Sequence, residues 1–515
     1  MSIQRFFPLL LAAALTVSLS ACGEETETLQ PTPTPSQSQA QAQESAQPME
    51  FVLPCYPEAG FHPLTSNNRT NLALMGLVYD TLFELDEEFQ PQFALATAAS
   101  SADGLSWTIA IREGVTFSDG TPLTAAHVVS CLNAARQSTL YSARLAGITS
   151  VTGAGNLVTV ALSSPNGNLP ALLDIPIFLE NGGAVPLGTG DYTLVGSDKS
   201  WHLELRDQGW RRERPKLETI RLYAIDETDD LIYAFDTREI SLVGSDITGT
   251  SALGFSGNAE TVDYATSDML YVGFNTASGI CTSATVRRAL SQGIDRETIA
   301  ASALSHHAVA TALPIHPNSP FFDAGINTEL SYSLQTMSTM LTEAGWSQVD
   351  GKWSKGHTEL ALKLIVNQEN SYKVAAANAI AASLGGGGVT VTVETLPWDS
   401  YTAALTGGDY DLYLGEVRLT ADFDPTVLIG PAGALNYSRW TDADTAALLS
   451  AYRAAQGDTR KTAAAQLCLR LGEQMPFAPL CFKNWSILSQ WGQTAGASPT
   501  QQNIFHDFAQ WEIAG

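Results

Sequence analysis

The distribution of apolar and polar residues predicts strands and helices along most of the chain. Residues 107–112 alternate apolar and polar side chains, as a half-buried strand does. A turn signal at 119–120 follows, and Thr124 is a suitable N-cap for a helix whose apolar residues share one face. Short apolar runs at 51–55 and 485–488 predict further strands near the two ends of the globular part.

One segment, 408–425, combines a strand with an acidic loop. Tyrosines and leucines predict a short buried strand at 410–414, and Gly415 is expected to end it. Asp424 stands before a proline and an apolar run, which is typical of a helix N-cap. Asp422 has no comparable structural role, and a carboxylate on a loop between a strand and a helix is often a binding group.

The N-terminal residues have the pattern of a secreted lipoprotein. Arg5 precedes a charge-free apolar stretch, 6–21, which has the length of a signal peptide and is too short for a membrane span. It ends in Leu-Ser-Ala-Cys at 19–22, which resembles the lipobox of bacterial lipoproteins. We therefore expect cleavage of the signal peptide, 1–21, and lipidation of Cys22. This would anchor the protein outside the cytoplasm, on the bacterial cell membrane. An ordinary cleavage site before Cys22 is the alternative.

Length and composition bound the remaining chain. Residues 22–49 are rich in Pro, Thr, Ser and Gln without apolar periodicity, which predicts a disordered tether before a globular part that begins near Glu50. A chain of 515 residues predicts roughly two to four domains. Its 27 basic and 53 acidic residues give a net charge of -26, so nucleic acid is not expected as a partner. We interpret the acidity as a solubility feature.

The cysteines after Cys22 are not spaced like a zinc site or a redox C-x-x-C motif. They are Cys55, Cys131, Cys281, Cys468 and Cys481. We favour reduced, buried thiols, because a chain of this size is stable without disulfides. A bridge between Cys468 and Cys481 is the alternative.

Motifs of catalysis and cofactor binding are missing from the sequence. There is no G-x-S-x-G elbow, H-E-x-x-H pair, P-loop or dinucleotide-binding fingerprint. Glycines at 385–388 lie between a predicted helix and a predicted strand at 389–393, where we expect a permissive turn. We therefore expect a binding protein without catalytic residues, cofactor or metal, and rank an extracellular hydrolase below it.

A series of motifs runs through the chain in a fixed order. Residues 78–136 contain a Tyr-x-x-Leu segment, a strand that ends in arginine and, at 117–125, the sequence Phe-Ser-Asp-Gly-Thr-Pro-Leu-Thr-Ala. Further motifs follow at 188–192, 270–276, 286–290, 293–296, 344–346 and 475–480. Together they resemble the bacterial extracellular solute-binding proteins of family 5, receptors that feed peptides, nickel complexes and related solutes to ABC importers. Ala126 and His127 depart from the acidic pair usual in that family.

The resemblance implies an α/β fold of the periplasmic-binding-protein type II, with two lobes around a ligand cleft and an extra α/β domain. The expected parts are lobe I (50–76, 182–262 and 487–515), the extra domain (77–181) and lobe II (263–486). The chain would cross between the lobes near 262 and 487. A hinge motion at these crossings would close the cleft around the ligand.

The same resemblance implies three ligand-binding residues. Asp422 matches a cleft aspartate that pairs with the α-ammonium group of the peptide in related receptors, and a solvated loop aspartate is the alternative. Trp398 stands where related proteins place an aromatic residue on the ligand, and a core tryptophan is the alternative. Arg418 lies where a Gly-Trp step is common in the family. It would meet a ligand carboxylate, and a solvated arginine is the simpler interpretation.

The expected function is therefore that of a lipid-anchored, monomeric receptor. It would bind short peptides between its lobes and deliver them to the permease and ATPase subunits of an ABC importer. A receptor for a nickel chelate or another small solute is the first alternative. His306, His307 and His316 raise it, but adjacent histidines point apart and the spacing is irregular. A surface lipoprotein that senses peptides without transport is the second alternative.

Overall fold

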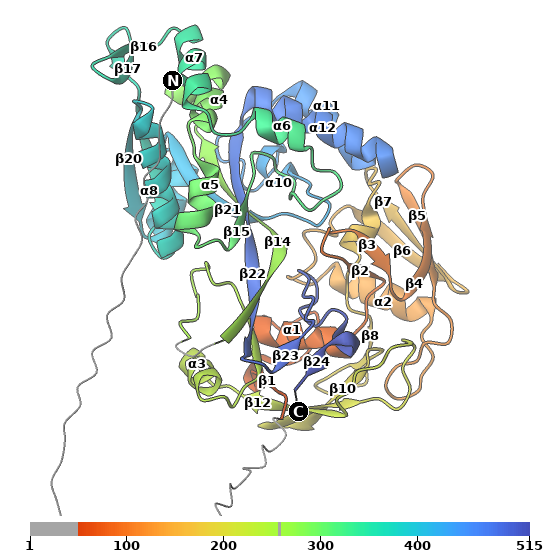
Figure 1. Ribbon diagram of the computed structural model, residues 1–515. Helices are drawn as coiled ribbons and strands as arrows, with labels where there is room; N and C mark the ends of the chain where they lie inside the picture. Colours follow the sequence, from red (N-terminus) through yellow and green to blue (C-terminus); the bar gives the residue numbers. More distant parts are fainter. Residues whose placement is uncertain (1–49, 256–258, 515) are drawn as a thin grey trace, which may run out of the picture. The chain divides into compact units, whose positions relative to one another are not determined.

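The computed structural model describes residues 50–255 and 259–514. The expected signal peptide, the expected lipidation site Cys22 and the whole of the expected tether lie outside these residues. All described residues belong to Pro48–Gly515, the second of two units into which the chain divides. Figure 1 shows long strands running through this unit, with smaller sheets and helices at both of their ends.

A four-stranded sheet forms near the start of the described chain. Its strands, in spatial order, are β1 (Val52–Cys55), β12 (Thr219–Ala224), β11 (Ser200–Leu205) and β10 (Tyr192–Ser197). The helix α1 (Arg69–Val78) packs on it through its apolar face, and the side chain of Asn68 caps the helix by accepting from the Asn71 N–H at 3.0 Å. The strand predicted at 51–55 is confirmed.

A second four-stranded sheet packs into the same core. Its order is β4 (Ala96–Ser100), β5 (Ser106–Ile111), β7 (Leu157–Leu162) and β6 (Ile148–Ala154). The helix α2 (Ala125–Ala135) covers it, with Val128 and Leu132 fully buried. The strand predicted at 107–112 and the N-cap predicted at Thr124 are both confirmed.

The largest sheet is built on two long antiparallel strands. In spatial order it contains β13 (Leu242–Ser245), β22 (Phe477–Gln490), β14 (Ala259–Phe274), β21 (Leu412–Arg418), β19 (Ala361–Asn367) and β20 (Thr390–Leu396), and β15 (Ala308–Ala310) also pairs with β22. The ladder between β14 and β22 extends from the pair Ala259 and Gln490 to the pair Gly273 and Phe477. These two strands therefore lie between β13 on one side and β21 on the other.

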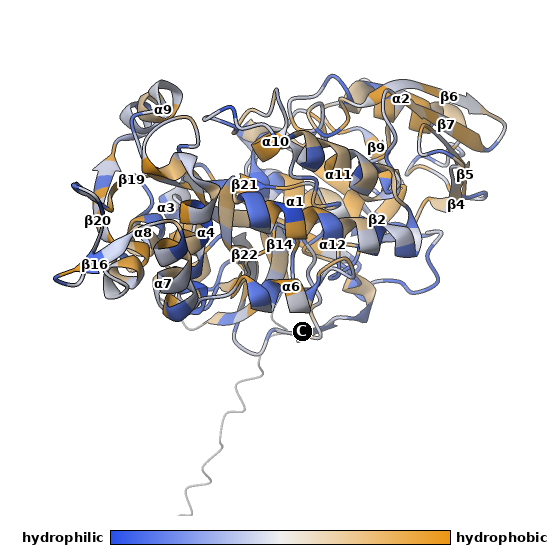
Figure 2. Cartoon of the chain, turned by 90° about the horizontal axis from the view of Figure 1, so that it is seen from above, coloured by the Kyte–Doolittle hydropathy of each residue, from blue (hydrophilic) through white to orange (hydrophobic). Residues whose placement is uncertain are grey.

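Alternate residues of β14 face two separate cores. Leu270 and Val272 belong to one core, and Met269 and Tyr271 belong to the other. The first core includes residues of α4 (Ala284–Gln292), α7 (Leu334–Glu343) and α8 (Ser371–Gly386), and the second includes residues of α9 (Trp398–Gly407), α11 (Ala443–Ala454) and α12 (Gly457–Gln474). In Figure 2 these helices carry hydrophilic as well as hydrophobic residues, as expected of helices with one buried face.

The remaining elements are short. They are η1 (Pro57–Ala59), β2 (Phe83–Leu85), β3 (Pro91–Phe93), η2 (Leu169–Leu172), β8 (Phe178–Leu179), β9 (Leu187–Gly188), α3 (Thr228–Asp236), η3 (Ile280–Thr282), α5 (Arg296–Thr298), η4 (Ile299–Ala303), α6 (Ala324–Glu329), β16 (Ser347–Val349), β17 (Lys352–Lys355), β18 (Thr358–Glu359), α10 (Thr426–Ile429), β23 (Thr494–Ala495), η5 (Phe508–Gln510) and β24 (Glu512–Ile513). In the part of the chain that the structure describes, no helix has the length and apolar character needed to cross a bilayer.

The prediction that Gly415 ends its strand is wrong. The strand β21 continues through Gly415 to Arg418, because Val417 and Arg418 pair with Met269 and Asp268 of β14. Gly415 is needed for close packing, since a Cβ atom there would lie 2.6 Å from the ring of Tyr271. Arg418 is therefore held on a strand and not on a loop.

All cysteines of the described chain are free and buried, which agrees with the preference for reduced thiols. Burial raises the pKa of each of these thiols to about 12, so they stay protonated at neutral pH. The alternative of a bridge between Cys468 and Cys481 is not realised.

Gly167 lies at a close backbone contact between the segment after β7 and the end of α11. Its N–H donates to the carbonyl oxygen of Arg453 at 2.6 Å. A Cβ atom at Gly167 would lie only 2.0 Å from the carbonyl oxygen of Ala455. Any larger residue would therefore force the two segments apart.

The Gly167→Ala variant is expected to lower the free energy of unfolding by about 1–3 kcal/mol, because an extra methyl group in a close contact forces backbone shifts. Chemical denaturation measures this change. Gly385→Ala is the matched control, because Gly385 lies in α8 and not in the turn expected at 385–388, and an added Cβ would meet no atom beyond its own helix within 4 Å. Alanine is also favoured over glycine in helices. Equal stability of the two variants would contradict the close contact at Gly167.

Candidate functional site

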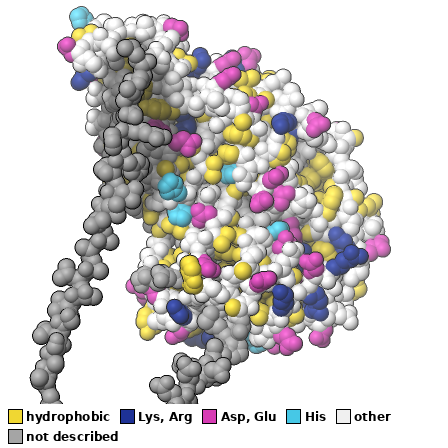
Figure 3. All heavy atoms as spheres, viewed as in Figure 1, with side chains coloured by type: hydrophobic (Ala, Val, Ile, Leu, Met, Phe, Trp, Pro, Cys, Tyr) yellow, Lys and Arg dark blue, Asp and Glu magenta, His cyan; other side chains and the backbone are white. Residues whose placement is uncertain are grey.

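A cleft of about 1790 Å³ is lined by segments that are far apart in the sequence. They are α1 with the loop before it, parts of 140–176, β13 with the loop after it, the end of β21 with the loop to α10, and 501–505. The cleft thus draws on the segments assigned from the sequence to lobe I, the extra domain and lobe II. On the face shown in Figure 3, acidic and basic side chains are interspersed without an extended basic patch.

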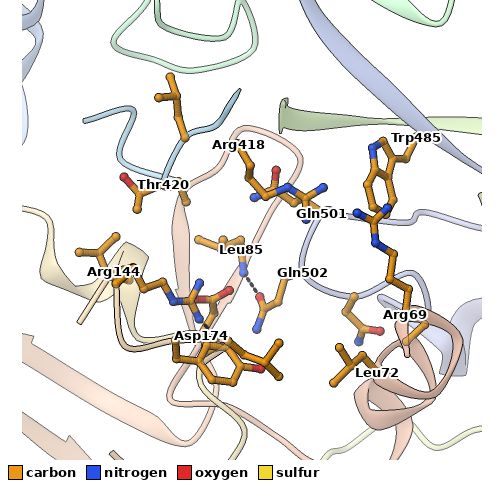
Figure 4. A pocket seen from close by; sticks show the side chains of 18 of the residues that line it. Arg69, Leu72, Leu85, Arg144, Asp174, Arg418, Thr420, Trp485, Gln501 and Gln502 are labelled. Carbon is orange, nitrogen blue, oxygen red and sulfur yellow. Dashed lines mark hydrogen bonds and ion pairs between the residues drawn. The ribbon is translucent and has the colours of Figure 1, made fainter. Parts of the chain in front are cut away.

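One wall of the cleft holds two arginines against one tryptophan. The Cζ atoms of Arg69 and Arg418 lie 4.5 Å and 4.6 Å from the centroid of the Trp485 ring, and Figure 4 shows the three side chains together. Arg418 also forms a bidentate pair with Asp268, with Nε 2.7 Å from Oδ1 and Nη2 2.9 Å from Oδ2. Burial alone would lower the pKa of Arg418, but the Asp268 carboxylate raises it above its ordinary value. Arg418 therefore stays charged.

Another part of the wall carries an ion pair between Arg144 and Asp174. Nη1 of Arg144 lies 2.8 Å from Oδ1 of Asp174, and both side chains are visible in Figure 4. Burial raises the pKa of Asp174, and the nearby Arg144 opposes this shift. The guanidinium group of Arg144 also lies over the ring of Tyr141, with 4.9 Å between its Cζ and the ring centroid.

Asp422 lines the cleft, but its side chain is only 1 % exposed. Its carboxylate accepts from the Thr420 hydroxyl at 2.6 Å and from Nδ2 of Asn166 at 3.4 Å. Nη2 of the buried Arg460 lies 3.7 Å from Oδ2 and donates to the Asp422 carbonyl oxygen at 3.1 Å. Asp422 is therefore not a solvated loop residue, because its charge is balanced inside the protein.

Asp424 combines a capping contact with an ion pair. Its Oδ1 accepts from the Thr426 N–H at 2.9 Å at the start of α10, and its Oδ2 lies 3.2 Å from Nε of Arg453. The helix begins one residue later than the sequence predicted, because its N-cap is Pro425 and not Asp424. Burial raises the pKa of Asp424, and the neighbouring Asp422 carboxylate adds to this rise. The two acids of this loop thus each have an arginine of their own.

An ion cluster lies beside the cleft at the middle of the large sheet. Nζ of Lys483 on β22 lies 2.9 Å from Asp246 and 3.0 Å from Glu416, and Nζ of Lys373 lies 2.7 Å from Glu416. Asp246 and Glu416 also line the cleft. Burial acts to raise the pKa of Glu416, but the two lysines outweigh it and the pKa is lowered. Glu416 is therefore ionised and neutralised within the protein.

Trp398 does not line this cleft. It is the first residue of α9, its side chain is 55 % exposed, and its ring lies 5.8 Å from that of Tyr401. The structure thus brings Asp422 and Arg418 to the same cleft and leaves Trp398 outside it. Trp485 is the cleft tryptophan instead. A strand was predicted at 485–488, but no local pattern marked this residue as part of a site.

The charges of the cleft are almost fully balanced by protein groups. Each lining acid forms an ion pair with an arginine or lysine: Glu84, Asp174, Asp246, Glu416, Asp422 and Asp424. The lining cations with an acidic partner are Arg144, Arg418 and Arg453. Among the described residues, Arg69 has no acidic partner. No sequence pattern marked Arg69 as part of a site.

The family model described as "Bacterial extracellular solute-binding proteins, family 5 Middle" matches residues 88–433, which is more than half of the chain. The chain belongs to this family. Family 5 proteins are solute-binding receptors of ABC importers and not enzymes, and they have the type II periplasmic-binding fold. The predicted family and fold class are therefore confirmed for this family 5 protein.

Relatives of this family 5 protein include peptide-binding and metal-binding receptors. The oligopeptide-binding protein AppA of Bacillus subtilis is 24% identical over 380 residues, which cover 68% of this chain and 69% of AppA. The murein tripeptide binding protein MppA, in an unliganded open form, has a TM-score of 0.74 at 18% identity, covering 91% of this chain and 98% of MppA. NikA of Brucella suis, in complex with Fe(III)-EDTA, has a TM-score of 0.69 at 20% identity, covering 90% and 99%. At these identities the solved structures show a shared fold.

The three histidines considered as nickel ligands have different surroundings. Nδ1 of His307 lies 2.8 Å from Oδ2 of Asp263, and His306 has a left-handed backbone with φ of 65°. Within 50–255 and 259–514, no three His, Cys, Asp or Glu side chains are grouped as metal ligands would be.

His316 is fully buried beside two phenylalanines. Its ring centroid lies 5.0 Å from that of Phe89 and 5.1 Å from that of Phe482. Nδ1 accepts from the Asn318 N–H at 3.0 Å, and Nε2 has no hydrogen-bond partner. Burial lowers the pKa of His316 to about 4, so the ring is neutral in the folded protein near neutral pH.

Stability is expected to fall as the pH is lowered from 6.5 towards about 4, because the unfolded chain protonates His316 near 6.5 and the folded chain does so only near 4. The unfolded state thus binds more protons in this window, and the loss attributable to His316 is about 3 kcal/mol. Denaturation at several pH values should show a smaller decline for His316→Gln. His357→Gln is the control, because His357 is exposed, and its stability should decline with pH as that of the unmodified protein does. Parallel profiles for all three proteins would contradict the assignment.

Proposed function

We propose that this family 5 protein is the lipid-anchored receptor of an ABC importer and binds short peptides in the cleft. The cleft volume carries the proposal, because about 1790 Å³ lies well above the roughly 300–1,000 Å³ of pockets for small ligands. A ligand of several linked residues would use this space. A bare ion or a single amino acid would leave most of it to water.

The named relatives support peptides as the ligand class. AppA of Bacillus subtilis is an oligopeptide-binding protein whose structure was determined with a nonapeptide, and MppA binds a murein tripeptide. Nickel-binding relatives also match, including the nickel-binding periplasmic protein of Escherichia coli at 22% identity. A receptor for a nickel chelate is therefore the alternative, and metal analysis of the purified protein distinguishes it.

Cleft closure would use the long pair of β14 and β22. The proposed crossings between the lobes fall at Val262 and Ile487, which are direct partners in this ladder. Rotation about this pair would move the lobe I segments against the lobe II segments. A ligand that contacts both sides would stabilise the closed state, because those contacts exist only there.

Binding measurements with a library of short peptides test the function. Mass spectrometry of whatever is released on denaturing the purified protein would identify a ligand that co-purifies. Uptake of a bound peptide by cells, and its loss when this chain is deleted, would distinguish transport from sensing. A folded protein that neither binds nor releases any peptide would contradict the proposal.

Asp422 is proposed to contact the peptide α-ammonium group, which would share the carboxylate with Arg460. Asp422→Asn is then expected to weaken peptides with a free amine by about 2–5 kcal/mol, because a desolvated ion pair loses one charge. N-acetylated peptides should be affected far less. Calorimetry of both peptide classes measures this difference.

Two comparisons separate this role from a structural one. Asp409→Asn removes an exposed carboxylate outside the cleft and should leave all affinities unchanged. Equal losses for free and acetylated peptides with Asp422→Asn, together with lower stability, would show that Asp422 serves Arg460 and not the ligand.

Lipid attachment is proposed at Cys22, which lies outside the described residues. Cys22→Ser is expected to abolish incorporation of a labelled fatty acid and to release the protein from the membrane fraction, because serine lacks the thiol that is lipidated. Cys131→Ser is the control, since Cys131 is a buried free thiol and should not change anchoring. Labelling that persists in Cys22→Ser would overturn this assignment.

A further inference from the structure

Arg69 is a cleft cation that the protein does not neutralise. Among the described residues its guanidinium group makes no hydrogen bond and no ion pair, and it lies over the ring of Trp485. The side chain is exposed and lines the cleft. An arginine that is positioned by an aromatic ring, with its donors unused, is able to bind a ligand anion.

Arg418 adds a second guanidinium group at the same ring. Asp268 occupies its Nε and Nη2, and its Nη1 donates to no group in the part of the chain that the structure describes. Since Arg69 and Arg418 both lie against one centroid, their charges are within about 9 Å of each other, near one Debye length at physiological salt. Asp268 balances one of the two charges, so this wall keeps a net positive charge.

Two further features of the wall favour an anion. Nε1 of Trp485 is buried and has no hydrogen-bond acceptor. The helix α1 begins at Arg69, and Asn67, Asn68 and Thr70 also line the cleft, so the positive end of the helix dipole lies at the same wall. These donors come from β21, β22 and α1, which are separate elements of the fold.

We infer that Arg69, Trp485 and Arg418 form a subsite for a carboxylate group of the ligand. This rests on the proposed function and adds the place where the negative end of the peptide binds. The planar fork of arginine matches a carboxylate, and pairing is stronger in a partly desolvated cleft. The indole ring holds the two guanidinium groups in place, so less conformational freedom is lost on binding. A carboxylate here and an ammonium group at Asp422 would give the peptide one direction in the cleft.

Matched peptides test the subsite. Each peptide is prepared with a free C-terminal carboxylate and as the C-terminal amide, and a second series exchanges an internal Glu for Gln. The original protein should prefer the carboxylate form of one series. Arg69→Gln should weaken that form by about tenfold to a hundredfold, because a hydrogen-bonded pair with a charged group is lost, and should leave the amide form nearly unchanged. The affinity of Arg69→Lys for the carboxylate form should lie between those of the unmodified protein and Arg69→Gln.

The controls distinguish the subsite from peptide binding itself. Arg212→Gln removes the same charge from an exposed residue outside the cleft and should change no affinity. Arg69 makes no hydrogen bond among the described residues and would lose only its contact with the Trp485 ring, so the midpoint of thermal unfolding should change little. If the original protein binds carboxylate and amide forms equally, or if Arg69→Gln weakens both equally, the subsite is wrong while peptide binding stands. If no peptide binds, the proposed function is wrong, and the subsite with it.

Discussion

The long pairing of β14 with β22 is the constraint on which the cleft depends. β22 pairs with β13 on its other side, and β14 pairs with β21 on its other side, so this ladder connects the two parts of the sheet. The register is interrupted between Ala265 and Met269, and such irregularities re-aim side chains. Asp268 lies in this interruption and holds Arg418, and Trp485 lies opposite Tyr264 on the partner strand. Backbone hydrogen bonds of the sheet therefore position the cleft wall.

Charge balance is the second constraint on the cleft. Removing a carboxylate from water costs roughly several kcal/mol of free energy unless a cation and hydrogen bonds compensate its charge. Asp422 satisfies this with Arg460, and Glu416 does so with Lys373 and Lys483. The acidic composition of the chain therefore does not make the cleft acidic. The charge that the protein leaves uncompensated in the cleft is therefore the positive charge of Arg69.

Local sequence patterns predicted the elements better than the site. The strand at 107–112 and the cap at Thr124 depend on neighbours in the sequence, and the structure has them. The helix expected after Asp424 is present too, but it begins one residue later, with Pro425 as its N-cap. The expected strand end at Gly415 failed, because pairing with β14 outweighs the low strand preference of one glycine. Family motifs supplied the fold class. Neither local patterns nor family motifs indicate which side chain from a distant part of the sequence contacts a given residue.

The site itself depends on such distant approaches. Arg418 and Trp485 approach each other because β21 and β22 both pair with β14. Arg69 comes from the helix α1, more than 400 residues from Trp485 in the chain. Asp422 was found by its position in a motif, yet its state is set by Arg460, which no motif connects to it. Whether an acidic residue of the cleft is available to bind a ligand can thus be judged only after its partners within the protein are known. By this criterion Arg69, which has no acidic partner among the described residues, is better suited than Asp422 to bind a ligand group of opposite charge.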